Sequence, residues 1–121
     1  MFCRGIRGAI TVSANTKEAI IAASKELLQE MIKANEVEID DVAGILFTTT
    51  SDIDAEFPAV AARELGWSHL ALLCGHEMNV PGSLPHCLRV LMLFNTEKSS
   101  EEIVHVYLEG AQALRADTSK D

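Results

Sequence analysis

The sequence predicts an α/β (α+β) fold with five extended segments, one long helix and one shorter helix. Three observations predict it: β-branched and apolar segments lie between turn residues, one stretch has helical apolar spacing, and a second, short helix has clear start and stop signals. A chain of 121 residues has the length of one domain. We expect residues 1–115 to form that domain and 116–121 to be a short C-terminal tail.

The first extended segment covers residues 2–12. It mixes β-branched and apolar residues with Gly5 and Gly8, which permit a bulge or the close approach of another backbone. We therefore expect a strand against which another element packs closely.

The long helix is predicted from Lys17 to about Ala34. Asn15, with Glu18 three residues later, suggests an N-cap with a capping box. Apolar residues recur at helical spacing on one side, at Ile20, Ala23, Leu27 and Met31. The pattern indicates an amphipathic helix with one buried face.

The second strand and the shorter helix follow. Residues 42–50 are apolar and end in a run of threonines, which suits a pleated surface. After a loop at 51–56, Phe57-Pro58 opens a helix that runs to Leu65, and Gly66 is a natural residue to end it.

The rest of the chain predicts the remaining extended segments, at 69–75, at 87–95 and in part of 105–115. The Pro- and Gly-rich stretch 80–85 forms a turn between the first two. Two serines followed by two glutamates at 99–102 can start a short helical turn.

Composition excludes several classes of partner. The formal net charge of −8 argues against nucleic acid and against an anionic membrane surface, because both require a basic surface. No stretch is long enough to span a bilayer. Two arginines among the first eight residues interrupt the apolar run that a signal peptide needs, so we expect a cytoplasmic protein.

The cysteines and histidines indicate neither a disulfide framework nor a metal site. Three cysteines are an odd number and lie far apart, and no His or Cys pair has the spacing of a structural zinc site. Cys74 could be a nucleophile, but the sequence shows no activating group, and a buried cysteine is the commoner outcome.

The arginines differ from the lysines in their placement. Three of the five lysines lie on the predicted long helix, where solvation explains them, whereas none of the arginines does. Arg89 interrupts a strongly apolar strand, where a charge is costly unless it is paired or faces a polar cavity. Arg4 and Arg7 are three positions apart, so a regular strand projects them to opposite faces.

Other candidate residues have ordinary explanations when each is taken alone. Arg63 on the short helix could be a solvated surface residue, Tyr107 a core aromatic, and Glu77 a loop carboxylate. Arg89 could form a structural ion pair.

Five short pieces occur in order along the chain: Arg4-Gly-Ile-Arg7-Gly-Ala; Phe57-Pro-Ala with Ala62-Arg-Glu-Leu65; Cys74 with Glu77-Met; Cys87-Leu-Arg-Val90; and His105-Val-Tyr-Leu-Glu109. Together they cover the chain from Arg4 to about Arg115 and resemble the monofunctional chorismate mutases of the trimeric pseudo-α/β-barrel class.

The resemblance implies a homotrimer with a mixed five-stranded sheet in each chain, helices on its outer face, and active sites between subunits. One chain would contribute Arg7, Glu77, Arg89, Tyr107 and Arg115. Its neighbour would contribute Phe57, Arg63, Leu72 and Leu73. Val60 stands where some family members have a lysine, and the tail after Arg115 is short.

The resemblance also implies the activity, which is the rearrangement of chorismate to prephenate in aromatic amino-acid biosynthesis. This reaction is unimolecular and pericyclic, so it requires no nucleophile, metal or cofactor. It does require a compact substrate conformer and a donor for the charge that grows on the ether oxygen.

We assign roles to the site residues on this basis. Arg7 and Tyr107 would hold a substrate carboxylate, Arg89 would reach the ether oxygen, and Glu77 would accept the ring hydroxyl with Cys74 close by. Phe57 and Leu114 would form apolar wall, and Arg63 would act at the entrance.

Two other interpretations stay open from the sequence. One is a non-catalytic trimeric module that binds a small carboxylate, because a fold alone does not fix activity. The other is an imine or enamine hydrolase, for which the sequence offers no water-activating base beyond Glu77.

Overall fold

A computed structural model describes residues 1–114 of the chain. It contains the five strands and two helices that the sequence predicts: β1 (Phe2–Thr11), α1 (Lys17–Asn35), β2 (Val42–Thr49), α2 (Ala59–Glu64), β3 (Leu72–His76), β4 (Cys87–Thr96) and β5 (Val106–Leu108). Three short 3-10 turns complete it: η1 (Ile39–Asp41), η2 (Ser100–Glu102) and η3 (Glu109–Ala113). Arg115 and the predicted tail 116–121 lie outside the described residues.

The strands form one mixed sheet in the order β3-β2-β4-β1-β5. The central pairs, β2 with β4 and β4 with β1, are antiparallel, whereas both edge strands pair in parallel, β3 with β2 and β5 with β1. The prediction of a mixed five-stranded sheet is confirmed.

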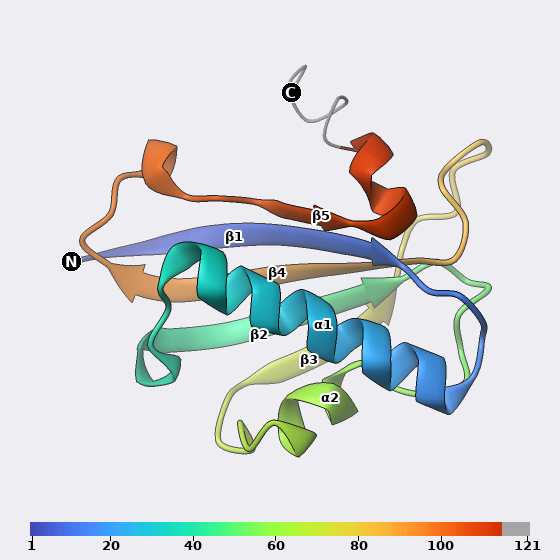
Figure 1. The fold of residues 1–121 in the computed structure, drawn as a ribbon, viewed down its shortest axis with the longest axis horizontal. Coiled ribbons are helices and arrows are strands. Elements are labelled where there is room, and N and C mark those ends of the chain that lie inside the picture. The colour runs from blue at the N-terminus through green and yellow to red at the C-terminus, as the bar shows by residue number, and fades with distance from the viewer. Residues whose placement is uncertain (115–121) are drawn as a thin grey trace.

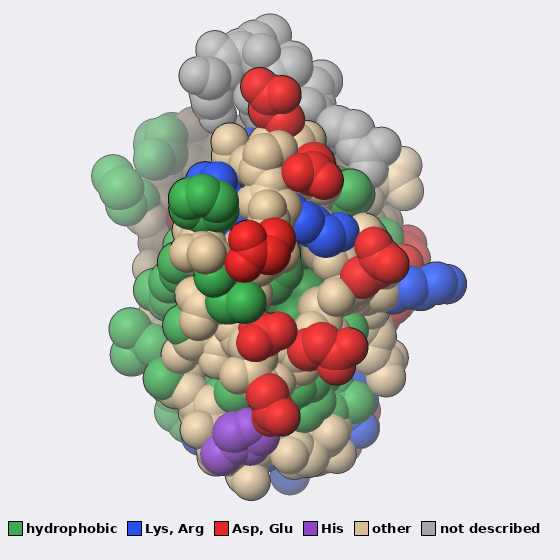
Figure 2. Space-filling model, turned by 90° about the vertical axis from the view of Figure 1, so that its left-hand side faces the viewer, with side chains coloured by type: hydrophobic (Ala, Val, Ile, Leu, Met, Phe, Trp, Pro, Cys, Tyr) green, Lys and Arg blue, Asp and Glu red, His purple; other side chains and the backbone are tan. Residues whose placement is uncertain are grey.

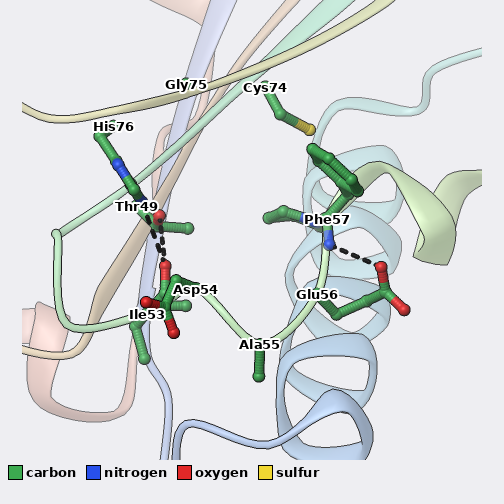
Figure 3. A pocket seen from close by; sticks show the side chains of 10 residues that line it. Thr49, Ile53, Asp54, Ala55, Glu56, Phe57, Cys74, Gly75 and His76 are labelled. Carbon is green, nitrogen blue, oxygen red and sulfur yellow. Dashed lines mark hydrogen bonds between the residues drawn. The ribbon is translucent and has the colours of Figure 1, made fainter.

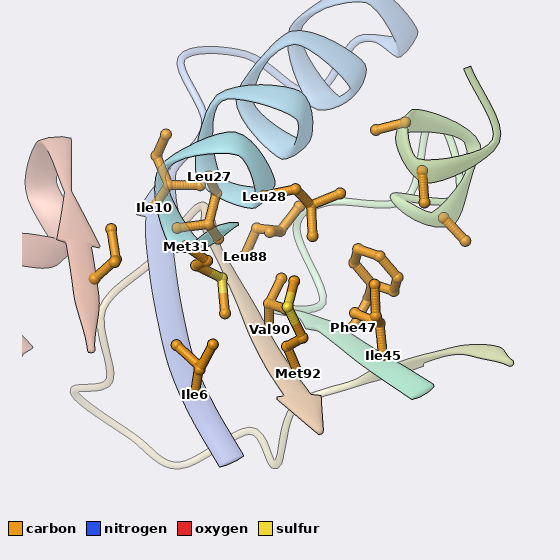
Figure 4. Packing of buried hydrophobic residues seen from close by; sticks show 14 of the residues in the cluster. Ile6, Ile10, Leu27, Leu28, Met31, Ile45, Phe47, Leu88, Val90 and Met92 are labelled. Carbon is orange, nitrogen blue, oxygen red and sulfur yellow. The ribbon is translucent and has the colours of Figure 1, made fainter. Parts of the chain in front are cut away.

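Both helices cover the same face of this sheet (Figure 1). The core lies between the helices and the sheet. There, Leu27, Leu28 and Met31 of α1 pack over the core-facing residues of β1, β2 and β4 (Figure 4). The burial of these side chains is the main stabilising contribution to the fold. The expectation that the helices share one face is confirmed.

The start of α1 differs from the prediction. The N-cap is Thr16, whose hydroxyl accepts the Ala19 N–H at 3.1 Å. Asn15 instead uses its amide in the loop before α2, where its oxygen accepts the N–H groups of Asp54 and Ala55. The local pattern allowed either residue, and the tertiary contact decides between them.

The last strand occupies part of the segment 105–115, as predicted. Only Val106–Leu108 pair with β1, and the chain then turns into η3 at Glu109, which has a positive φ of 52°. Gly66, by contrast, has a φ of 90° directly after α2, which confirms its predicted role in ending that helix.

The second face of the sheet is covered only at one end, where Ala111 of η3 and Leu84 pack over Ala9 and Cys87. Alternation along β4 puts Leu88, Val90 and Met92 in the core and leaves Arg89 and Leu91 on the other side. Apolar side chains on this open face stay exposed, Leu91 by 37% and Leu46 by 38%. The rest of this face, around Leu46 and Leu91, is therefore apolar and has no cover within residues 1–114.

Gly8 lets α1 pack closely on β1, and we expect Gly8→Ala to destabilise the fold. A Cβ built at Gly8 would lie 2.4 Å from the Met31 sulfur and 3.1 Å from Leu27 Cδ1, both of them fully buried side chains. Overpacking of this kind costs about 1–3 kcal/mol, which urea unfolding would measure. Gly75→Ala is the matched control in β3, because nothing lies within 4 Å of its Cβ. An equal effect of the two substitutions would contradict this account of Gly8.

Candidate active site

The main cavity of interest lies on the open face of the sheet. It has a volume of about 560 Å³, and its lining includes five of the predicted site residues: Arg7, Glu77, Arg89, Tyr107 and Leu114. They come from β1, from the residue after β3, from β4, from β5 and from the end of η3. The strand order brings these distant parts of the sequence together.

Arg89 is the most informative residue of this cavity. Its Nε lies 3.8 Å from a Glu77 carboxylate oxygen, which is an ion pair without a hydrogen bond. The same nitrogen is buried and has no hydrogen-bond partner among the described residues. An unpaired buried donor costs about 1–3 kcal/mol, so this N–H is suited to an acceptor on a ligand.

Glu77 is held at the rim of the cavity by β2. Its N–H donates to the Thr49 carbonyl at 2.8 Å, and its carboxylate accepts the Thr48 hydroxyl. Thr48 also lines the cavity, and the sequence reasoning missed it. The signal was available, because alternation from the buried Phe47 puts Thr48 on the open face beside Arg89, its partner in the β2–β4 register.

Arg4 and Arg7 project to opposite faces, as their spacing predicts. Arg7 faces the cavity, whereas Arg4 donates from Nε to the Lys98 carbonyl at 3.0 Å and stacks on the Phe2 ring. Tyr107 is 7% exposed and pairs with Ala9 of β1. Arg7 and Tyr107 therefore approach the cavity from neighbouring strands.

A second cavity, of about 290 Å³, lies at the β3 edge of the sheet, and Phe57 and Cys74 line it. Phe57 precedes α2 and is 65% exposed, and the Cys74 sulfur points toward its ring (Figure 3). His76 and Thr49 also line this cavity, and the side chains of both contact the Ile53 carbonyl. Within one chain, Cys74 and Glu77 thus line different cavities.

The environment of Cys74 favours a neutral thiol. Burial raises the pKa of this thiol above its ordinary value, and the Ala59 N–H and the Arg63 guanidinium oppose that effect only in part. A nucleophilic cysteine needs the thiolate. Arg63 itself is exposed on α2, close enough for its charge to act on Cys74.

The two leucines of β3 point in different directions. Leu72 packs against the core. Leu73 is 65% exposed and lies on the open face, where it pairs with Leu46 in the β2–β3 register. Leu73 therefore lies on the same uncovered surface as the cavity that contains Arg89. The predicted site residue Arg115 lies outside the described residues.

Acidic side chains are spread over the end of the molecule where β1 starts. Figure 2 looks at the end of the molecule where β1 starts and shows Asp and Glu spread over it, and this end includes Asp40 and Asp41 of η1 and Glu101 and Glu102 of η2. The cavity lies toward the opposite end, where β1, β2 and β3 finish and β4 begins. The cavity itself contains two arginines and one carboxylate, Arg7, Arg89 and Glu77.

Residues 1–114 contain neither a metal-binding cluster nor a membrane-spanning helix. No group of three or more His, Cys, Asp or Glu side chains there is arranged to hold a metal ion. No helix in that part of the chain has the length and apolar character needed to cross a membrane.

The fold and these cavities define a class, which is a small α+β protein with a cavity on its sheet that contains two arginines. The sequence model of the family described as chorismate mutase type I matches residues 3–118. The chain is 48% identical to chorismate mutase AroH of Thermus thermophilus, over 94% of both chains. It is 44% identical to chorismate mutase AroH of Bacillus subtilis, over 98% of this chain and 94% of that protein.

A solved structure agrees with these matches. A chorismate mutase from Clostridium thermocellum superimposes with a TM-score of 0.90 at 53% sequence identity, covering 91% of this chain and 98% of the other. The chain belongs to the chorismate mutase type I family. Its function is that of a chorismate mutase, an isomerase of aromatic amino-acid biosynthesis, as the resemblance implied.

Proposed function

We propose that chorismate is rearranged in a cleft between two subunits of a homotrimer. The cavity with Arg7, Glu77, Arg89 and Tyr107 would come from one chain, and Phe57, Arg63, Leu73 and Cys74 from its neighbour. The observation that carries this proposal is the Arg89 N–H, buried without a hydrogen-bond partner among the described residues at the wall of an open cavity. The uncovered apolar face around it supports a subunit boundary at this place.

The reaction explains why these residue types suit the cavity. In chorismate a carbon–oxygen bond breaks as a carbon–carbon bond forms, and negative charge grows on the ether oxygen. Arg89 would donate to that oxygen, and Arg7 with Tyr107 would hold a carboxylate so that the enol-pyruvyl group stays folded over the ring. Glu77 would accept the ring hydroxyl.

The remaining residues would form the walls and the entrance of the site. Leu114 from one chain and Phe57 from the other would provide apolar wall, and the neutral thiol of Cys74 would lie near the ring. Arg63, exposed on α2, would attract the dianion at the entrance. Arg115 would be a further substrate-binding residue of this site.

Magnitudes are consistent with a site built from donors alone. An acceleration of about 10⁶-fold, at the low end for enzymes, corresponds to about 8 kcal/mol. One preorganised donor at a developing charge contributes about 2.7–4 kcal/mol. Arg89 would therefore supply about a third to a half, and selection of the compact conformer most of the rest.

Mixing two inactive variants tests the shared site. Arg89→Ala removes the donor from one side of the proposed cleft, and Arg63→Glu puts a carboxylate on the other side against a dianion. If the trimer is cyclic and each site uses two chains, refolding the variants together at equal amounts restores about a quarter of the sites. The readout is the loss of chorismate absorbance without added metal or cofactor.

The outcomes separate the proposals. Activity in the mixture but in neither variant supports a site between subunits, and a mixture as inactive as its components contradicts it. We also propose that the protein acts in the cytoplasm.

A further inference from the structure

The segment that leads into β5 is fixed by two side chains, at Val104 and at His105. Asn35, fully buried at the end of α1, accepts the Val104 N–H and donates to the Val104 carbonyl, both at 2.8 Å. The same amide donates to the Met31 carbonyl at 3.0 Å. The segment before β5 is therefore held to α1 by the Asn35 side chain, whose NH₂ group donates twice and whose oxygen accepts once.

His105 ties the same segment to β1. Its Nδ1 accepts the Arg7 N–H at 2.9 Å. The parallel β1–β5 ladder consists of three residue pairs and starts with Gly8 opposite Val106, so Arg7 is the residue just before it. The imidazole nitrogen thus takes the place of a carbonyl at the end of a very short ladder.

The residues on either side of this hydrogen bond belong to the proposed site. Arg7 supplies a guanidinium to the cavity, and Tyr107, two residues after His105, lines the same cavity. Besides the three ladder pairs, Asn35 holds Val104, and the Gly110 N–H after β5 donates to the Thr11 hydroxyl at 2.9 Å. The His105 hydrogen bond is the side-chain contact that joins this segment to Arg7 itself. The His105 hydrogen bond is therefore well placed to fix the distance between the two groups.

We propose that His105 is a positioning residue, whose neutral ring holds β1 and β5 in register so that Arg7 and Tyr107 meet one substrate carboxylate. This inference rests on the proposed function, because it assumes that these two residues bind the substrate. His105 does not line the cavity, so it would act through Arg7 rather than on the substrate.

The surroundings of His105 favour the neutral ring that the hydrogen bond requires. Burial, and second the Arg7 guanidinium, lower the pKa of His105 below its ordinary value of 6.5. The group that meets this segment from α1 is the uncharged Asn35 amide, and Tyr107 is the nearest titratable group along β5. No carboxylate within residues 1–114 forms an ion pair with the ring.

The sign of the pH effect follows from these groups. A protonated ring cannot accept at Nδ1, so the hydrogen bond is present at neutral pH and is lost as pH falls through the lowered pKa. Because the unfolded chain binds that proton first, the stabilising contribution of the neutral ring decreases as pH falls below about 6.5.

The test compares His105→Ala with His105→Asn in the full-length protein. The Asn Oδ1 occupies nearly the position of Nδ1 and accepts a hydrogen bond at any pH, whereas Ala removes the acceptor. We expect His105→Ala to lower kcat/KM for chorismate by about 10-fold or more at neutral pH, mainly through KM, because the carboxylate anchor is displaced. His105→Asn should stay within about 2-fold of the unmutated protein.

The pH profile provides a readout that general destabilisation would not change. The unmutated protein should lose kcat/KM as pH falls below about 6.5 and through the lowered pKa of His105, and His105→Asn should lack this decrease. Thermal unfolding and oligomeric state are measured for every variant, so that assays use folded protein.

Each outcome has one meaning. Near-normal kinetics of His105→Ala, with a large defect in Arg7→Ala, would overturn the positioning role and leave the proposed function intact. Equal defects in folded His105→Ala and His105→Asn at all pH values would overturn the acceptor role. Normal kinetics of both Arg7→Ala and Arg89→Ala would instead refute the proposed function.

Discussion

Arg89→Ala is expected to lower kcat for chorismate by at least about 100-fold while the oligomer persists. Arg89 is the donor that we place at the ether oxygen, and loss of one donor at a developing charge costs about 2.7–4 kcal/mol. The loss should appear in kcat and kcat/KM alike, because the interaction strengthens only in the transition state. Initial rates over a range of chorismate concentrations measure both.

Arg4→Ala is the matched control for Arg89. Arg4 is also a strand arginine with a partly buried side chain, but it lies on the helix side of the sheet and donates to the Lys98 carbonyl. Its removal should leave kcat within about 2-fold. Near-normal turnover of Arg89→Ala would refute the assignment of the ether-oxygen donor.

Arg89→Lys separates charge from geometry at the same position. Lysine keeps the positive charge but has no Nε–H in the place where Arg89 has its unpartnered donor. We therefore expect this variant to keep part of the affinity for the dianion while kcat stays far below that of the unmutated protein. Full kcat in the Arg89→Lys variant would mean that charge alone is needed.

The elements could be predicted from the sequence because local patterns determine them. Helical spacing at Ile20, Leu27 and Met31 located α1, and Gly66 located the end of α2. The predicted N-cap was wrong because Asn15 has a partner at 54–55, far along the chain. No local pattern contains such a contact.

The site could be predicted only in part, for a related reason. Alternation put Arg4 and Arg7 on opposite faces, and the family resemblance supplied Glu77, Arg89 and Tyr107. Thr48 and His105 were missed as contacts of site residues, because their roles depend on strand order and register. Those are properties of the sheet as a whole and not of any single segment.

Leu91→Glu is expected to dissociate the proposed trimer, and activity should be lost with it, because Leu91 also lines the Arg89 cavity. Leu91 is on the open face of β4, where it pairs with Arg7 of β1 and Leu46 of β2 in a patch that no element within 1–114 covers. If a neighbouring subunit covers this patch, burying the new carboxylate costs about 3–5 kcal/mol wherever Arg7, which lies beside it in the cavity, does not pair with it. That cost weakens association by about 10²- to 10⁴-fold.

Light scattering and turnover at the same protein concentration measure the two effects together. The fold of each chain should persist, because Leu91 points away from the core, and the circular dichroism spectrum checks this. Phe2→Glu is the control: Phe2 is a 55% exposed apolar residue that stacks with Arg4, away from the open face. A trimer that survives Leu91→Glu would show that this face is not the subunit boundary, and the neighbour's Phe57 and Arg63 would then have no route to Arg89.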